Sequence, residues 1–159
     1  DMTVACRSNQ AMMNEIFQAA ADATGNKFAP FVLTGSSGSP VSVMRFLNNM
    51  LKVDPEDTLV FFYCGHGVTT LGGHTFAQSN GRISRASVRD GLLRHRAKLT
   101  LLLSDTCSNY GLRAPTAGNG LVRAKDPKVA VDLLFKSSGF VDMTAASPGE
   151  FSVFDEEDD

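Results

Sequence analysis

Apolar positions along the chain follow two patterns, helical spacing in some segments and unbroken runs in others. Spacings of three and four residues occur in four segments, which carry Met13, Ile16, Phe17 and Ala20; Val43, Leu47, Met50 and Leu51; Val88, Leu92 and Leu93; and Val129, Leu133 and Leu134. Four other segments are predicted to be strands, at residues 28–33, 58–64, 99–104 and 140–146; of these, 58–64 is a continuous apolar run and 99–104 is nearly so, as expected for strands covered on both faces. Because strands separated by helices run parallel, we predict an α/β fold with a mostly parallel sheet and helices on both faces.

Polar residues and glycines mark where these elements begin and end. Residues that can cap or start a helix precede each amphipathic segment, namely Ser8 or Asn9, Ser39 with Pro40, Ser84, and Asp126 with Pro127. Gly25 ends the first helix. Two stretches rich in glycine and polar residues, 65–82 and 108–125, are predicted to be loops.

The composition is that of one globular domain spanning residues 1–159. The chain is 43% hydrophobic and 20% charged, and its net charge of -2 lacks the basic surplus that nucleic-acid binding needs. No apolar run approaches the ~18 residues of a membrane span. Three cysteines are few and odd in number, so we expect no disulfide framework. Because Asp1 is not an initiator and no strand precedes the first helix, we expect a trimmed piece. The compartment and the oligomeric state stay open.

Reactive side chains follow three of the predicted strands. His66 comes after the second strand, Asp105 and Cys107 after the third, and Glu150 after the fourth. Ligands of an open parallel sheet bind beyond the carboxyl ends of its strands. If these strands are neighbours, the four side chains meet at one edge of the sheet.

A cysteine and a histidine at one edge indicate nucleophilic catalysis. The thiolate is the attacking form of cysteine, and an imidazole beside Cys107 can take the thiol proton and later protonate a leaving amine. Backbone N–H groups next to the nucleophile can bind the oxyanion of the intermediate. Gly65 and Gly67, on either side of His66, allow a substrate backbone to approach and the Gly67 N–H to point at it.

Two motifs carry a resemblance to a known family. The stretch "FFYCGHG" resembles the histidine strand of the caspase-like cysteine peptidases, and "LLLSDTCSN" resembles their nucleophile strand in the Asp-x-Cys form of metacaspases and paracaspases. His66 precedes Cys107 by 41 positions, near the ~50 of caspases. The resemblance implies a caspase-like three-layer α/β/α sandwich and a cysteine endopeptidase. It assigns His66 as the catalytic histidine, Cys107 as the nucleophile, and the N–H groups of Gly67 and Cys107 as oxyanion donors.

The resemblance also bears on the substrate, expected to be a peptide or protein cut after Arg or Lys. Asp105 stands where metacaspases and paracaspases hold an acid for a basic side chain, and residues i and i+2 of an extended segment face the same way. Glu150 is expected to add a second carboxylate, whereas Asn9 stands where some members have an acid. The resemblance implies a further strand after Glu150, which we expect this piece to lack.

No cofactor or metal is expected. Some metacaspases use calcium, but the chain has no spaced calcium-ligand loop, and its acidic end is expected to be solvated. Cys64 and His66 could ligate zinc, although no second ligand pair stands at a suitable spacing.

Other interpretations stay open. The chain could be a catalytically inactive caspase-like module used for binding. Cys107 and Arg113 have the Cys-x5-Arg spacing of cysteine phosphatases, but Pro115 disfavours the helix that such a loop needs, and His66 would have no role.

Several residues also have plain structural interpretations. Cys107 and His66 could be structural, Asp105 a cap for the following loop, and Glu150 a solvated loop charge. The remaining cysteines and histidines are expected to be structural or surface residues: Cys64 inside a strand, Cys6 in the core or on the surface, His74 in a loop and His95 on a helix surface.

Overall fold

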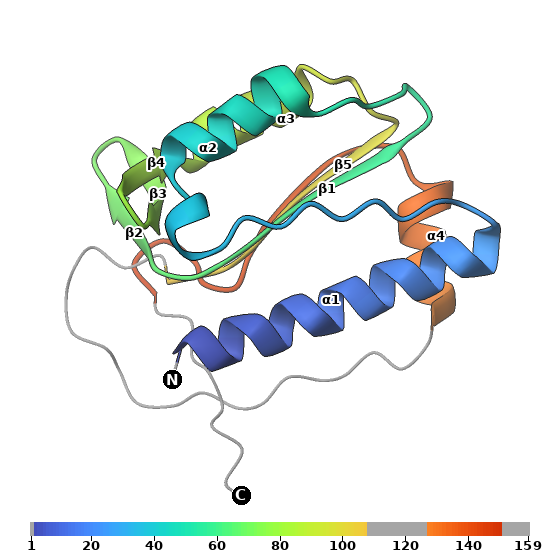
Figure 1. Cartoon of the computed structure of the whole chain (residues 1–159), viewed down its shortest axis with the longest axis horizontal. Helices are drawn as coiled ribbons and strands as arrows, with labels where there is room; N and C mark the ends of the chain where they lie inside the picture. The colour runs from blue at the N-terminus through green and yellow to red at the C-terminus, as the bar shows by residue number, and fades with distance from the viewer. Residues whose placement is uncertain (1, 108–126, 151–159) are drawn as a thin grey trace, which may run out of the picture.

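A three-stranded parallel sheet lies at the centre of the computed structural model, which describes residues 2–107 and 127–150 (Figure 1). Its strands are β1 (Thr58–Cys64), β5 (Leu99–Asp105) and β6 (Gly139–Thr144), with β5 in the middle. The β1–β5 register runs from Thr58 opposite Leu99 to Cys64 opposite Asp105, a constant separation of 41 residues. The apolar runs at 58–64 and 99–104 therefore predicted two neighbouring parallel strands.

Helices cover both faces of this sheet, as predicted (Figure 1). Two of them, α2 (Pro40–Arg45) and α3 (Arg85–Leu93), lie on one face, while α1 (Met2–Thr24) and α4 (Pro127–Lys136) lie on the other. A 3-10 turn, η1 (Gly35–Ser37), precedes α2, and a π-helical turn, η2 (Phe46–Met50), follows it. The chain is thus a mixed α/β structure.

Each face of the sheet has its own hydrophobic core. On one face Leu102 of β5 packs with residues of α2, η2, α3, β3 and β4, namely Val43, Leu47, Val88, Leu92, Phe76 and Ile83. On the other face Leu99 and Leu101 pack with Ala20 of α1 and Leu134 of α4. Side chains alternate between the two faces of a strand, so an unbroken apolar run such as β5 supplies both cores at once.

The glycine-rich stretch 65–82 is not the predicted loop. It forms an antiparallel sheet of three short strands, β2 (Gly67–Thr70), β3 (Gly73–Gln78) and β4 (Gly81–Ser84), beyond the carboxyl end of β1 (Figure 1). Gly73 and Gly81 have φ values of +98° and +139°, where a side chain would be strained, so these glycines mark tight hairpin turns. Phe76 and Ile83 then place the hairpin against the core.

Two further predictions about the amino-terminal half are wrong. Residues 28–33 form no strand; Pro30 has no N–H for a strand ladder, and the Phe31 ring stacks on Phe46, 3.8 Å between ring centroids. The first helix begins at Met2 and not after Ser8 or Asn9. The Asn9 side chain lies inside that helix and reaches Asp105, so it cannot cap.

Helix starts within the described residues agree better with the prediction. The Ser39 hydroxyl accepts a hydrogen bond from the Ser42 N–H with Pro40 in the first helical position, and the Ser84 hydroxyl accepts one from the Ser87 N–H. The expected cap at Asp126 lies outside the described residues. Among those that are described, no helix is both long and apolar enough to cross a membrane.

Candidate active site

His66 and Cys107 occupy matching positions beyond two neighbouring strands. The last pair of the β1–β5 ladder joins Cys64 to Asp105, and the Gly65 N–H extends the pairing by donating to the Asp105 carbonyl, 3.2 Å away. His66 lies two residues beyond Cys64, and Cys107 two residues beyond Asp105. Adjacent strands are about 4.8 Å apart, so His66 and Cys107 follow the same end of the sheet on neighbouring strands. His66 is exposed and Cys107 is half-buried.

The main chain of His66 is fastened to the hairpin that follows it. Its carbonyl oxygen accepts a hydrogen bond from the Ala77 N–H at 2.8 Å and is 2.9 Å from the Tyr63 hydroxyl, which can donate to it. The Tyr63 hydroxyl also reaches the Ala77 carbonyl, and its ring packs on Phe76. Burial raises the pKa of Tyr63 to about 12, which keeps the phenol protonated and able to donate.

Gly67 lies directly against the chain that carries Cys107. A Cβ atom at Gly67 would be 2.5 Å from the Cys107 carbonyl oxygen and 2.7 Å from His74 Nε2, and it would overlap Thr106 Oγ1. Ordinary contacts of a Cβ atom begin at 3.4 Å. Only glycine therefore fits here, and its role is close approach between β2 and the end of β5.

The Gly67 N–H points away from β3. In an antiparallel ladder, successive residues direct their N–H and C=O groups to opposite sides of the strand. The His66 carbonyl points toward β3, because it accepts from the Ala77 N–H. The N–H of the next residue, Gly67, therefore faces away from β3 and is not used in the β2–β3 ladder.

Asp105 faces the first helix. Asn9 Nδ2 of α1 donates a hydrogen bond to Asp105 Oδ2 at 2.6 Å, and the same carboxylate oxygen is 3.8 Å from Cys64 Sγ. The carboxylate is half-buried. The structure therefore brings together Asp105 and Asn9, two residues that the sequence analysis considered for one pocket.

Glu150 lies in the turn that follows β6. Its side chain is exposed, and Oε2 accepts a hydrogen bond from the Ser147 N–H at 2.8 Å. The Glu150 N–H in turn donates to the Ser147 carbonyl at 2.9 Å. The carboxylate thus closes its own turn, and its role as a second pocket carboxylate stays a prediction.

Cys64 lies in a strand, as expected, but the expectation that the cysteines form no disulfide is wrong. Cys6 and Cys64 are joined by a disulfide that ties α1 to the last residue of β1. Their spacing of 58 residues gives no local signal of this pairing. Because the sulfur of Cys64 is used in this bond, it is not the thiolate that a zinc site with His66 would need.

His74 lies at the site, although its sequence position predicted only a loop residue. The residue lies on β3 rather than in a loop, and its Nε2 is 3.0 Å from the Cys107 carbonyl oxygen. His74 is 33 residues from Cys107 in sequence, and only the hairpin brings the two together. The β-branched Thr75 and the aromatic Phe76, which follow a glycine at a turn, are the sequence signal that would have predicted a strand containing His74.

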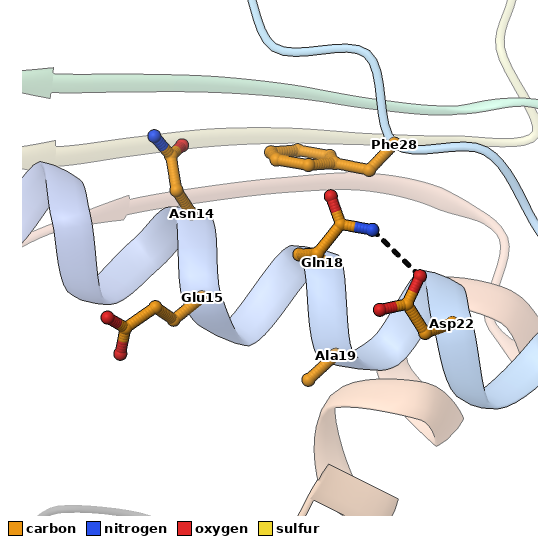
Figure 2. Close-up of a pocket in the computed structure, with 6 residues that line it drawn as sticks. All are labelled: Asn14, Glu15, Gln18, Ala19, Asp22 and Phe28. Atoms are coloured by element: carbon orange, nitrogen blue, oxygen red, sulfur yellow. Dashed lines mark hydrogen bonds between the residues drawn. The ribbon is translucent and has the colours of Figure 1, made fainter.

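A shallow pocket lies elsewhere, along the carboxyl half of α1 (Figure 2). Its lining consists of Asn14, Glu15, Gln18, Ala19, Asp22 and Phe28. Figure 2 shows Gln18 turned toward Asp22, to which its amide donates a hydrogen bond at 2.8 Å. This lining contains no nucleophile and no base paired with one, so it adds nothing to the chemistry at the strand ends.

Arg113, the second half of the Cys-x5-Arg alternative, lies outside the described residues, and so does the whole predicted loop at 108–125. Comparisons of the chain with models of protein families, with curated proteins and with solved structures found no match.

Proposed function

We propose that this chain is a caspase-like cysteine endopeptidase, nearest to the metacaspase and paracaspase branch, with the three-layer α/β/α sandwich of that family. One observation carries the proposal. His66 and Cys107 each follow, by two positions, the last paired residue of adjacent parallel strands, and this equal offset supports a dyad at one end of the sheet. The assignment to this family rests on the resemblance of the motifs "FFYCGHG" and "LLLSDTCSN" to its histidine and nucleophile strands.

The proposed mechanism uses a dyad. His66 accepts the proton of the Cys107 thiol, and the thiolate attacks the carbonyl carbon of the scissile peptide bond. The resulting oxyanion is bound by the N–H groups of Gly67 and Cys107. Collapse of the intermediate breaks the C–N bond, and the His66 imidazolium gives its proton to the leaving amine. Water, deprotonated by His66, then hydrolyses the thioester and releases Cys107.

The proposed specificity is for Arg or Lys on the acyl side of the cut bond. The half-buried Asp105 carboxylate lies two residues before the nucleophile, and Asn9 holds it in place. A carboxylate partly shielded from water attracts a guanidinium or ammonium group and repels an acidic one. Arg is favoured over Lys, because its planar fork can pair with a carboxylate through two hydrogen bonds.

The test is hydrolysis of fluorogenic peptides that carry Arg, Lys, Asp or Leu before the scissile bond. Wild type is expected to cleave the Arg and Lys peptides, whereas Cys107→Ala and His66→Ala each abolish cleavage without unfolding the chain. Because the two residues act as one unit, the double variant should be no worse than either single one. Cleavage by Cys107→Ala at the wild-type rate would contradict the mechanism.

Two other outcomes would favour the alternatives. Hydrolysis of p-nitrophenyl phosphate that is lost in Arg113→Ala would indicate a cysteine phosphatase. Binding of the peptides by wild type and Cys107→Ala alike, with no cleavage by either, would indicate an inactive binding module.

A further inference from the structure

The carbonyl oxygen of the proposed nucleophile is held from two sides. His74 Nε2 is 3.0 Å from the Cys107 carbonyl oxygen, and the Thr106 hydroxyl donates to the same oxygen at 3.3 Å. A carbonyl oxygen only accepts hydrogen bonds, so the proton of the first bond belongs to Nε2 of His74. The ring nitrogen nearest to Cys107 is therefore already a donor to the main chain.

The His74 ring has little freedom to leave this position. His74 is paired with Thr69 in the β2–β3 ladder. Its imidazole ring packs edge-to-face with the Phe76 ring, with centroids 5.4 Å apart and an interplanar angle of 83°. Phe76 is completely buried. Gly67 passes so close that its missing side chain leaves room for the His74 ring and the Cys107 carbonyl. A rigid strand thus presents a rigid donor.

The charge state of His74 fits a donor rather than a base. Burial lowers the pKa of His74, the hydrogen bond to Cys107 opposes this, Arg85 lowers the pKa further and Asp142 raises it. The Arg85 guanidinium lies over the Phe76 ring, 5.5 Å from its centroid, and pairs with Asp142. At neutral pH the ring is accordingly neutral, and the carbonyl selects the tautomer with the proton on Nε2.

We propose that His74 is a positioning residue, whose Nε2–H holds the Cys107 carbonyl so that the thiol stays aligned with His66. The inference rests on the proposed function for its catalytic readout. A shift of the Cys107 main chain would carry the thiol with it, and the hydrogen bond from His74 on β3 to the Cys107 carbonyl opposes such a shift. His66 is then the base, and His74 sets the geometry in which that base works.

Two substitutions at His74 separate the hydrogen bond from the bulk of the ring. His74→Phe keeps an aromatic ring against Phe76 but has no donor, whereas His74→Gln places an amide N–H near the position of Nε2. His74→Leu replaces the Phe variant if that variant does not fold. His95→Leu is the matched control, because His95 Nε2 is hydrogen-bonded to the Leu47 carbonyl at 2.7 Å on a different part of the fold.

Two rates are measured for each variant. One is turnover of the Arg peptide, as kcat and KM; the other is alkylation of Cys107 by iodoacetamide across pH, without reductant. The chain has three cysteines, and Cys6 and Cys64 form a disulfide, so alkylation reports on Cys107. A displacement near 1 Å can cost about a hundredfold in rate, so we expect His74→Phe to lower kcat and alkylation about ten- to a hundredfold with little change in KM.

Recovery of both rates in His74→Gln distinguishes a positioning role of His74 from a role as the base and from a merely structural role. His74→Gln should recover both rates to within about threefold of wild type, and His95→Leu should leave kcat near wild type despite its own lost hydrogen bond. Loss in His74→Gln as large as in His74→Phe would overturn the proposal and make His74 the base. Equal effects of His74→Phe and His95→Leu would reduce His74 to a structural role.

Failure of the proposed function is distinguishable from failure of this inference. If wild type cleaves no peptide, the endopeptidase proposal fails, but the alkylation rate still reports how Cys107 is held. A drop in His74→Phe that Gln restores would then support the positioning role by itself. Unchanged alkylation in His74→Phe would refute it.

Discussion

Replacement of Gly67 by alanine tests the packing on which the site depends. The new methyl group would lie 2.5 Å from the Cys107 carbonyl oxygen and would overlap Thr106 Oγ1. Ordinary contact begins at 3.4 Å, so the chain at Cys107 must move by about 0.9 Å relative to β2. Of the three crowded atoms, the Cys107 carbonyl oxygen belongs to the main chain and cannot move away by a side-chain rotation.

The size of the effect follows from this displacement. Overpacking of a well-packed site costs roughly 1–3 kcal/mol of folding stability. A shift near 1 Å between reacting groups can cost about a hundredfold in rate, which corresponds to about 2.7 kcal/mol of activation free energy. Because the carbonyl that moves belongs to Cys107, we expect Gly67→Ala to lose stability and, if the proposed dyad is correct, the position of the thiol relative to His66 as well.

Urea unfolding measures the first effect, and alkylation of Cys107 together with kcat/KM on the Arg peptide measures the second. Gly72→Ala is the control in the same hairpin, since a Cβ atom there would meet only Thr70 Oγ1, at an ordinary 3.6 Å. That variant should behave as wild type. If Gly67→Ala unfolds at the wild-type urea concentration and its Cys107 is alkylated at the wild-type rate, β2 does not pack on Cys107 as described.

Three further predictions concern charge. Asp105→Ala should abolish the preference for Arg over Leu, since loss of one partner of a buried charge pair costs roughly 2–5 kcal/mol; a preserved preference in kcat/KM would remove Asp105 from the pocket. Arg85→Met should lower the free energy of unfolding, measured in urea, by about 2–3 kcal/mol, because the Arg85 side chain is only 13% exposed and pairs with Asp142. The exposed Arg89 is the control, and Arg89→Met should cost less than about 1 kcal/mol; equal losses in the two variants would contradict this prediction. The lowered pKa of His74 means that the unfolded chain binds a proton first as pH falls below 6.5, so stability should fall there, and less so in His74→Gln.

The parallel sheet could be predicted because two of its strands, β1 and β5, are encoded locally by apolar segments. Residues 58–64 form β1 as the apolar run indicated, and β5 extends the run at 99–104 by one residue, Asp105. The last strand spans Gly139–Thr144 instead of 140–146, although the Ala145 N–H still donates to the Ser104 carbonyl. A strand that is buried on both faces has a nearly continuous apolar sequence, which is easy to recognise, whereas the short and partly exposed strands β2, β3 and β4 have no such pattern.

The missed features all depend on contacts between distant residues. The hairpin at 65–82 is built from short strands whose glycines, at the turns, gave the pattern of a loop. His74 reaches Cys107 across 33 residues, and Cys6 meets Cys64 across 58. Asn9, considered as a helix cap, uses its side chain on Asp105. No local propensity encodes such pairings, whereas the positions of His66 and Cys107 followed from strand ends alone.

Because β1 and β5 pair in a constant register, the length of the hairpin can change without moving His66 relative to the β1–β5 ladder. Residues inserted at Leu71 or Gly72 lengthen a turn and leave every β1–β5 pair unchanged. One residue inserted within β1 instead shifts His66 by about 3.3 Å along the sheet and reverses the face of each side chain beyond it. The chain can therefore change length between its two motifs during evolution, provided that neither strand gains or loses a residue.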